Sequence, residues 1–230
     1  MNMITINECE GGAGVFTVSD IVQPKMCISD FKKDHFKRQA FLTVSSQLQL
    51  EAMCCSLGNV YTTNRSFRSE HSSTSKHLSE FTHLEIEMCD CTEFDLMNIA
   101  ERYIKHIITV LLEKHNEDLE FLNKINKGLI VRLEQIIGKH FLRLSYNELE
   151  AIFSEGKQEF TYGEDLSSAH EKYLVEYFDG PVFVYNWPKE IKSFYMKKYS
   201  GDTSLVENFD LIMPHGVGEL IGGSMREDDY

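Results

Sequence analysis

The sequence has no long apolar run and little proline. With 4 prolines and 14 glycines among 230 residues, the chain lacks the composition of a disordered or low-complexity protein. No stretch approaches the ~20 consecutive apolar residues of a membrane helix, and residues 1–10 lack the basic start and apolar run of a secretory signal. These absences predict a cytoplasmic globular protein of one domain, or two small ones, with no membrane partner.

Basic residues and paired cysteines are also scarce. The chain has 23 Lys and Arg residues against 36 Asp and Glu residues, which gives a formal charge of −13. This acidic balance disfavours nonspecific attraction to polyanions, so no DNA partner is expected. Six cysteines are present, but none forms a CxxC pair. The spacing therefore argues against a zinc site, and we expect reduced structural thiols.

The periodicity of apolar residues predicts an α+β fold. Two-residue alternation over 80–88 predicts that one face of a strand carries Phe81, His83, Glu85 and Glu87. Ser45 and Ser46 precede a helical pattern and are N-cap candidates. These patterns predict a mostly antiparallel sheet flanked by helices, with a mostly helical section at about 94–155. We expect strands at 3–6, 15–18, 41–44, 60–67, 80–88, 181–185, 193–197, 209–213 and 218–224, and helices at 47–57, 92–114, 117–137 and 147–153.

The first candidate site combines Arg68 and Glu70 with Lys76, His77 and Phe81. The guanidinium of Arg68 is a planar, permanently charged fork suited to a phosphate. Lys76 and His77 would add cationic groups over the same site, and Phe81 supplies a flat face on which a purine could stack. A salt-bridged hairpin with a core phenylalanine is the alternative interpretation.

The second candidate site is the glycine-rich run 216–227. Glycines allow a ligand close to the backbone. Within this run, Glu219 can hold Mg²⁺, a hard cation that favours carboxylate oxygens, and Arg226 suits a carboxylate or carbonyl oxygen. A glycine-rich edge strand with surface charges is the alternative.

Both runs resemble the asparaginyl branch of the class II aminoacyl-tRNA synthetases. The string FRSEHSSTSKHLSEFTHLEIE at 67–87 is similar to motif 2 of that family, and GELIGGSMRE at 218–227 resembles its asparaginyl form. Shorter strings at 8–13, 41–48, 165–174 and 186–197 match in the same order. The resemblance implies the catalytic-domain fold of that class, an antiparallel sheet flanked by helices, with ATP and Mg²⁺ as cofactors.

The resemblance also implies roles for individual residues. Arg68 would be catalytic, because the family's arginine contacts the α-phosphate and the substrate carboxylate. Lys76 stands where arginine is more usual, which keeps the charge but loses the fork. The implied ATP-binding residues are Arg68, Glu70, Lys76, His77, Leu78, Phe81 and Glu219, with Glu219 also the metal ligand. The implied amino-acid-binding residues are Glu10, Gln47, Arg68, Glu85, Arg226 and Glu227.

The function that the resemblance implies is ATP-dependent activation of asparagine and its ligation to tRNA(Asn). The choice of asparagine over aspartate rests on few residues, chiefly Glu85, where aspartate enzymes usually carry Asp. Glu85 or Glu227 would accept the side-chain amide of asparagine and repel a carboxylate, while a solvated strand carboxylate is the alternative for Glu85. An aspartyl-tRNA synthetase, an asparagine synthetase-like enzyme and a non-catalytic paralogue that binds adenylate, a partner or RNA remain alternatives.

Three parts of the family pattern have no counterpart in the sequence. They are the anticodon-binding domain, the motif 1 helix that builds the family's homodimer, and motif 3 with its phosphate-binding arginine. We therefore expect residues 1–230 to be an incomplete catalytic domain with a helical insertion at about 94–155. On this hypothesis the chain alone is inactive or weak, and its dimerisation is doubtful.

Overall fold

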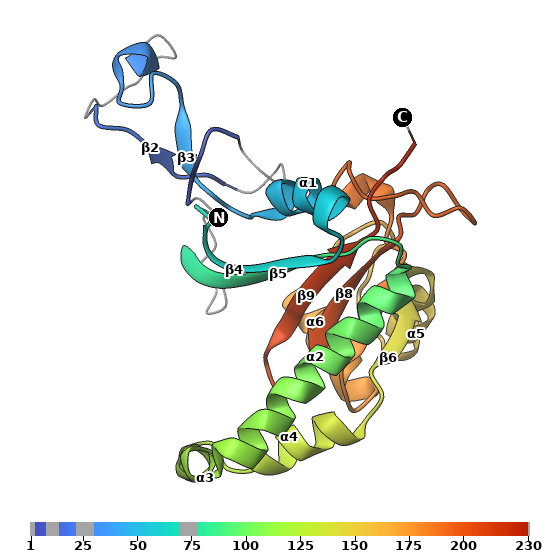
Figure 1. The fold of residues 1–230 in the computed structure, drawn as a ribbon. Helices are drawn as coiled ribbons and strands as arrows, with labels where there is room; N and C mark the ends of the chain where they lie inside the picture. Colours follow the sequence, from blue (N-terminus) through green and yellow to red (C-terminus); the bar gives the residue numbers. More distant parts are fainter. Residues whose placement is uncertain (1–2, 8–13, 22–29, 70–77, 230) are drawn as a thin grey trace. The chain divides into compact units, whose positions relative to one another are not determined.

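The computed structural model describes residues 3–7, 14–21, 30–69 and 78–229. The chain forms two compact units, Met1–Asp90 and Cys91–Tyr230, which are called the N-terminal unit and the C-terminal unit below (Figure 1). No helix in the described ranges is long and apolar enough to cross a membrane.

The N-terminal unit contains two small antiparallel sheets and one α-helix. Strands β1, β3 and β2 form the first sheet in that order, and β4 pairs with β5 in the second. Leu50 and Cys54 are buried on one side of α1, and Gly58, with φ +78°, ends that helix. The elements are β1 (Ile4–Thr5), β2 (Thr17–Val18), the 3-10 helix η1 (Asp30–Lys33), β3 (Ala40–Leu42), α1 (Gln47–Leu57), β4 (Val60–Phe67) and β5 (Glu80–Glu87).

The C-terminal unit is a four-stranded sheet with helices on both faces. The strand order is β6-β7-β8-β9, in which β6 and β7 are parallel and the other pairs are antiparallel. The helices are α2 (Glu93–Lys114), α3 (Asn116–Ile125), α4 (Leu129–Gly138), η2 (Tyr146–Glu148), α5 (Leu149–Glu155), α6 (Ser168–Tyr177) and η3 (Lys189–Ile191). The strands are β6 (Leu142–Ser145), β7 (Val182–Tyr185), β8 (Asn208–Met213) and β9 (Gly218–Ser224).

Alternating residues of the central strands fill a separate core on each face of this sheet. Val182, Val184 and Ile212 pack with α5 and α6 in one cluster, whereas Phe183 and Leu211 pack with α2 and α4 in the other. Figure 1 shows these helices around β8 and β9. A strand that is apolar on both faces matches a sheet covered on both sides.

The structure confirms the α+β prediction and corrects two of its details. Residues 193–197 do not form a strand: Phe194 is 89% exposed, and the segment makes only isolated bridges, such as Met196 with Arg226. An apolar run without a buried face has no sheet to join. The helix expected at 117–137 is broken at Gly128, which has φ +81°. The 94–155 section is mostly helical, but its β6 belongs to the sheet.

Candidate functional site

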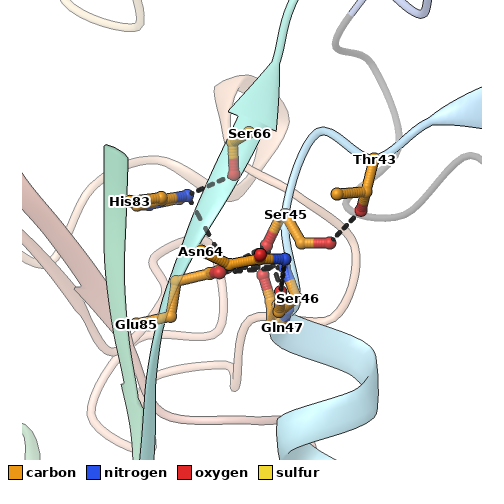
Figure 2. Close-up of polar contacts among 8 residues, drawn as sticks. All are labelled: Thr43, Ser45, Ser46, Gln47, Asn64, Ser66, His83 and Glu85. Atoms are coloured by element: carbon orange, nitrogen blue, oxygen red, sulfur yellow. Dashed lines mark hydrogen bonds and ion pairs between the residues drawn. The ribbon is translucent and has the colours of Figure 1, made fainter. Parts of the chain in front are cut away.

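A buried carboxylate on β5 holds the start of helix α1. Glu85 is only 9% exposed, and its Oε1 and Oε2 accept the N–H of Ser46 at 2.8 and 3.0 Å. The Ser45 hydroxyl donates to Oε1 of the same carboxylate, as Figure 2 shows. The first N–H groups of a helix lack partners within the helix and favour a negative charge. Glu85 is therefore a buried carboxyl group at the α1 N-terminus, not a solvated strand carboxylate.

Further hydrogen bonds fix the turn that leads into α1. Thr43 Oγ1 donates to the carbonyl of Ser45 at 2.6 Å, and Ser45 Oγ accepts the N–H of Gln47 at 3.0 Å. The Gln47 side chain is 7% exposed, and its Nε2 donates to Glu51 Oε1 at 2.8 Å. The serines cap the helix as predicted, but through Ser45 Oγ and not through Ser46, the N-cap residue. Gln47 is thus held in one orientation at the helix start.

Four predicted or neighbouring side chains follow one another along the face of β4 and β5. Ser66 lies opposite Phe81 in the ladder. The Arg68 guanidinium carbon lies 5.5 Å from the centroid of the Phe81 ring, which in turn is 5.4 Å from the His83 ring. His83 Nδ1 lies 3.1 Å from Ser66 Oγ and 3.7 Å from Glu85 Oε1. This face therefore offers a cation, an aromatic ring, an imidazole and a carboxylate in that order.

Sequence reasoning predicted part of this row and missed the rest. Alternation along 80–88 predicts that Phe81, His83 and Glu85 share a face, but His83 was not among the predicted site residues. The same alternation carried the signal, because His83 lies between them on that face. Leu78 is 65% exposed. Glu10, Glu70, Lys76 and His77 lie outside the described residues.

A second group of charged side chains lies in the C-terminal unit around Asp210 of β8. Lys192 Nζ contacts Asp210 Oδ2 at 2.7 Å, and both side chains are largely buried. The same ammonium lies 3.8 Å from the centroid of the Trp187 ring. A Cβ built on Gly222 would lie 3.4 Å from Asp210 Oδ1 and 3.6 Å from Glu219 Oε1. The missing side chain of Gly222 thus leaves room where the two carboxylates approach each other.

The two carboxylates face the same side because the ladder between β8 and β9 is irregular. Asp210 lies opposite Gly222, whereas Ile212 lies opposite Glu219, so the register skips one residue of β9, as at a β-bulge. Residues directly opposite in an antiparallel pair share a face. Glu219 and Gly222 therefore both lie on the Asp210 face, although residues three apart in a regular strand face opposite sides.

The proximity of the carboxylates perturbs their titration. The negative charge of Asp210 raises the pKa of Glu219 to about 7, assisted by packing around the carboxyl group even though the residue itself stays exposed. Burial raises the pKa of Asp210, and the nearby Lys192 opposes that shift. A divalent cation would relieve the repulsion, since Mg²⁺ is usually bound through one or two carboxylates with water and substrate phosphates.

Asp210 and Glu219 fit a metal site of that kind, in which water and a ligand complete the coordination. They do not fit a site in which protein side chains supply every metal ligand. In the described part of the chain, no group of three or more His, Cys, Asp and Glu side chains is placed to hold a metal ion. Asp210 and Glu219 would supply oxygen ligands, and the remaining positions would belong to water or a ligand. Sequence reasoning found Glu219 but missed Asp210 and Lys192. The charged residue within the apolar strand NFDLIM was the available signal.

The end of the described chain holds the last two predicted residues. Arg226 Nη1 donates to the Ser224 carbonyl at 2.9 Å and to the Ser224 hydroxyl at 2.6 Å, and its guanidinium lies 5.3 Å from the Tyr195 ring centroid. Glu227 pairs with Lys198 at 3.6 Å. The N–H of Asp229 is the main cause that lowers the pKa of Glu227. Arg226 and Glu227 belong to the C-terminal unit, and Glu85 belongs to the N-terminal unit.

The row on β4 and β5 and the charged side chains around Asp210 occur in a chain that matches a known protein family. A family model described as "tRNA synthetases class II (D, K and N)" matches residues 3–230. The chain belongs to this class II tRNA synthetase family. The described elements of this class II synthetase chain thus form a family fold, and the sequence resemblance is confirmed.

Individual relatives are asparagine enzymes. The asparagine--tRNA ligases of Clostridium novyi and Hahella chejuensis are 42% and 40% identical over 98% of this class II synthetase chain, and the matches cover 51% and 50% of those relatives. The solved asparaginyl-tRNA synthetase of Pyrococcus horikoshii, complexed with asparaginyl-adenylate, matches with a TM-score of 0.85 and 35% identity. That match covers 99% of this chain and 48% of the other. The chain spans about half the length of these relatives.

Proposed function

We propose that this chain takes part, in the cytoplasm, in the ATP-dependent activation of asparagine and its ligation to tRNA(Asn). The observation that carries the proposal is the row from Arg68 through Phe81 to the buried Glu85 on β5. It occurs in a chain similar to an asparaginyl enzyme solved with asparaginyl-adenylate. The row has the chemistry that such a ligand needs: a cation for a phosphate, a ring for a base and a carboxylate for an amide.

The reaction needs positioning more than it needs a protein nucleophile. A carboxylate oxygen of asparagine attacks the α-phosphorus of ATP, and the bond to pyrophosphate breaks. The terminal ribose hydroxyl of the tRNA then attacks the carbonyl carbon, and AMP leaves. The attacking carboxylate is already ionised at neutral pH, so no general base is required for the first step. Orientation of the reactants and stabilisation of developing charge supply the rate.

Residues on the N-terminal unit would bind the nucleotide and the substrate backbone. Arg68 would donate to the α-phosphate and the substrate carboxylate, and Phe81 would stack on adenine. Gln47, already held by Glu51, would contact the amino acid. Glu10 would approach the substrate amino group, and Glu70, Lys76, His77 and Leu78 would line the nucleotide.

Glu85 would read the side-chain amide of asparagine. An ionised carboxylate offers about four acceptor positions. Among the described residues, Ser45 and Ser46 donate to Oε1, while Oε2 receives only the longer branch of the Ser46 contact. Oε2 therefore keeps capacity for the amide N–H₂, and it would repel an aspartate carboxylate. Arg226 would donate to the amide oxygen, and Glu227 is the alternative acceptor.

Asp210 and Glu219 would hold Mg²⁺ in the C-terminal unit. The open space over Gly222 and the raised pKa of Glu219 support a cation there. When bound, the ion would neutralise charge on the ATP phosphates. Lys192 would keep Asp210 ionised and fix Oδ2, so that Oδ1 remains directed toward Glu219.

Ligand binding to the 230-residue chain tests the proposal. Calorimetry with the sulfamoyl analogues of asparaginyl- and aspartyl-adenylate should show tighter binding of the asparaginyl form. Arg68→Ala should weaken that binding, and in a longer form of the protein that supports ATP–pyrophosphate exchange it should lower the rate on the order of 10²–10³. Arg65→Ala is the matched control, because Arg65 lies on the same hairpin, is 54% exposed and only approaches Glu80 at 3.8 Å.

Each alternative gives a different result in these assays. Preference for the aspartyl analogue would identify an aspartyl enzyme, and exchange dependent on aspartate with asparagine as product would identify a synthetase of the amino acid. Analogue binding without exchange, in a longer form of the protein that includes the missing parts of the catalytic domain, would favour a non-catalytic paralogue. Unchanged binding in Arg68→Ala would refute the assignment of the row itself.

A further inference from the structure

Two cysteine thiols meet between helix α1 and the end of strand β5. Cys54 Sγ lies 3.2 Å from Cys89 Sγ, although the residues are 35 positions apart in the sequence. Cys89 Sγ also donates to the carbonyl of Cys54 at 3.3 Å, and the Cys89 N–H donates to Asn59 Oδ1 at 3.2 Å. Both residues belong to the N-terminal unit. The backbone and the side chain thus hold the two sulfur atoms against each other.

The two thiols differ in their access to solvent. Cys54 is 6% exposed, and burial, followed by the contact with Cys89, raises its pKa to about 12. Cys89 is exposed. A dissolved reagent can therefore reach Cys89 first. Cys54 is buried and remains a protonated thiol at neutral pH.

We propose that Cys54 and Cys89 form a redox-modification site whose oxidant is a small-molecule disulfide such as oxidised glutathione. The Cys89 thiol loses its proton to solvent, and its sulfur attacks the small disulfide. One small thiolate leaves and takes up a proton. A mixed disulfide remains on Cys89. Cys54 then attacks the Cys89 sulfur, gives up its proton and releases the second small thiol. Two protein thiols are oxidised to one disulfide, and one small disulfide is reduced to two thiols.

The new bond would connect the helix and strand at a second point. Glu85 of β5 already holds the N-terminus of α1 through Ser46. A bond from Cys54 to Cys89 would tie the C-terminal half of α1 to the end of the same strand. Oxidation would thereby restrain the helix that presents Gln47. This inference depends on the geometry of the N-terminal unit and not on the proposed function.

The test is oxidation of the full 230-residue chain with oxidised glutathione, followed by non-reducing proteolysis and mass spectrometry. The expected product is a peptide pair containing Cys54 and Cys89, lighter by two hydrogens than the reduced peptides. Trypsin leaves Cys55 with Cys54, and Cys91 with Cys89, because no Lys or Arg separates them. The variants Cys55→Ser and Cys91→Ser are therefore the controls, and both should retain the cross-link.

Single variants test the order of the two steps. Cys54→Ala should accumulate glutathione on Cys89, because the attacking thiol of the second step is gone. Cys89→Ala should leave Cys54 unmodified, because the buried thiol cannot reach the reagent. A cross-link that survives in Cys54→Ala, or a stable glutathione adduct on the wild-type Cys89, would overturn the proposal.

A second measurement uses only the wild-type chain and no oxidant. Phenylarsine oxide bridges two neighbouring thiols, so it should protect Cys54 and Cys89 together from alkylation. Cys55 should remain reactive under the same conditions, because it is exposed on the same helix. Protection of Cys55 instead, or alkylation of Cys89 at its unprotected rate, would contradict a paired site even if the variants fail to fold.

Discussion

The first turn of helix α2 carries a carboxylate whose burial has a measurable cost. Glu93 is 6% exposed, and its Oε2 has no hydrogen-bond partner among the described residues. Burial, with a smaller contribution from Glu207, raises the pKa of Glu93 from 4.5 to about 7. The folded protein therefore holds this proton at pH values where the unfolded chain has released it.

The sign and size of the effect follow from that shift. Stability falls as the pH rises from about 4.5 to about 7, since only the unfolded state gains from ionisation in this window. The full displacement corresponds to about 3 kcal/mol at roughly 1.4 kcal/mol for each pH unit. Water around the helix end screens part of this effect, so we expect about 1–2 kcal/mol. Below about pH 4.5 the penalty is absent.

Glu93→Gln removes the charge and nearly keeps the shape. The variant should match the wild type at pH 4.5 and exceed its stability by about 1–2 kcal/mol at pH 8. Urea unfolding followed by tryptophan fluorescence measures this difference by the environment of the C-terminal unit, because Trp187 is the single tryptophan and is 1% exposed there.

A neighbour on the same turn supplies a control of opposite sign. Hydrogen bonds from the Thr92 hydroxyl and backbone lower the pKa of Asp95. Its contribution to stability is present above the unfolded pKa of 3.8 and is lost as the pH falls. Asp95→Asn should therefore destabilise the protein at pH 8, with a gap that closes in acid. An equal difference between Glu93→Gln and wild type at both pH values would refute the reasoning.

Three further predictions concern packing and cross-links. Glu85→Ala should destabilise the N-terminal unit by about 3 kcal/mol, seen as faster amide exchange in α1, whereas Glu80→Ala at an exposed pair should change it by under about 1 kcal/mol. Gly223→Ala should cost about 1–3 kcal/mol by Trp187 fluorescence, because its Cβ would lie 2.6 Å from the Phe209 ring; Gly222→Ala at ordinary contact distance should be nearly neutral. Oxidation of the thiol pair should stabilise the N-terminal unit by about 4 kcal/mol in urea.

Local patterns in the sequence were sufficient to predict most of the helices and strands and the face of β5 that carries part of the site. Alternation in β5 depends only on the two-residue period of a strand, so the shared face of Phe81 and Glu85 could be predicted and is confirmed. The helix start at Gln47 was also visible, because serines favour the cap position. Such features need no knowledge of distant parts of the chain.

Features that depend on long-range pairing could not be predicted in the same way. The anchor of α1 by Glu85 joins residues 39 positions apart, and the contact of Cys54 with Cys89 spans 35. The composition of residues 193–197 predicts a strand, but in the described part of the chain no neighbouring strand provides a full ladder. Asp210 was not predicted as a site residue, because Glu219 shares its face of the sheet only as a result of the irregular register. The roles of the site residues toward ligands stay predictions.

Leu220 has no partner in the β8–β9 ladder, so the number of residues in this part of β9 does not by itself decide which face Glu219 occupies. A deletion of Leu220 would leave Glu219 opposite Ile212 in an even ladder, so both carboxylates would still share a face. A one-residue insertion in a regular part of β9 would instead turn Glu219 away from Asp210. Relatives can therefore differ by one residue between Glu219 and Gly222 and keep the same geometry. A search pattern with a fixed gap would overlook them, whereas one that allows this variation would not.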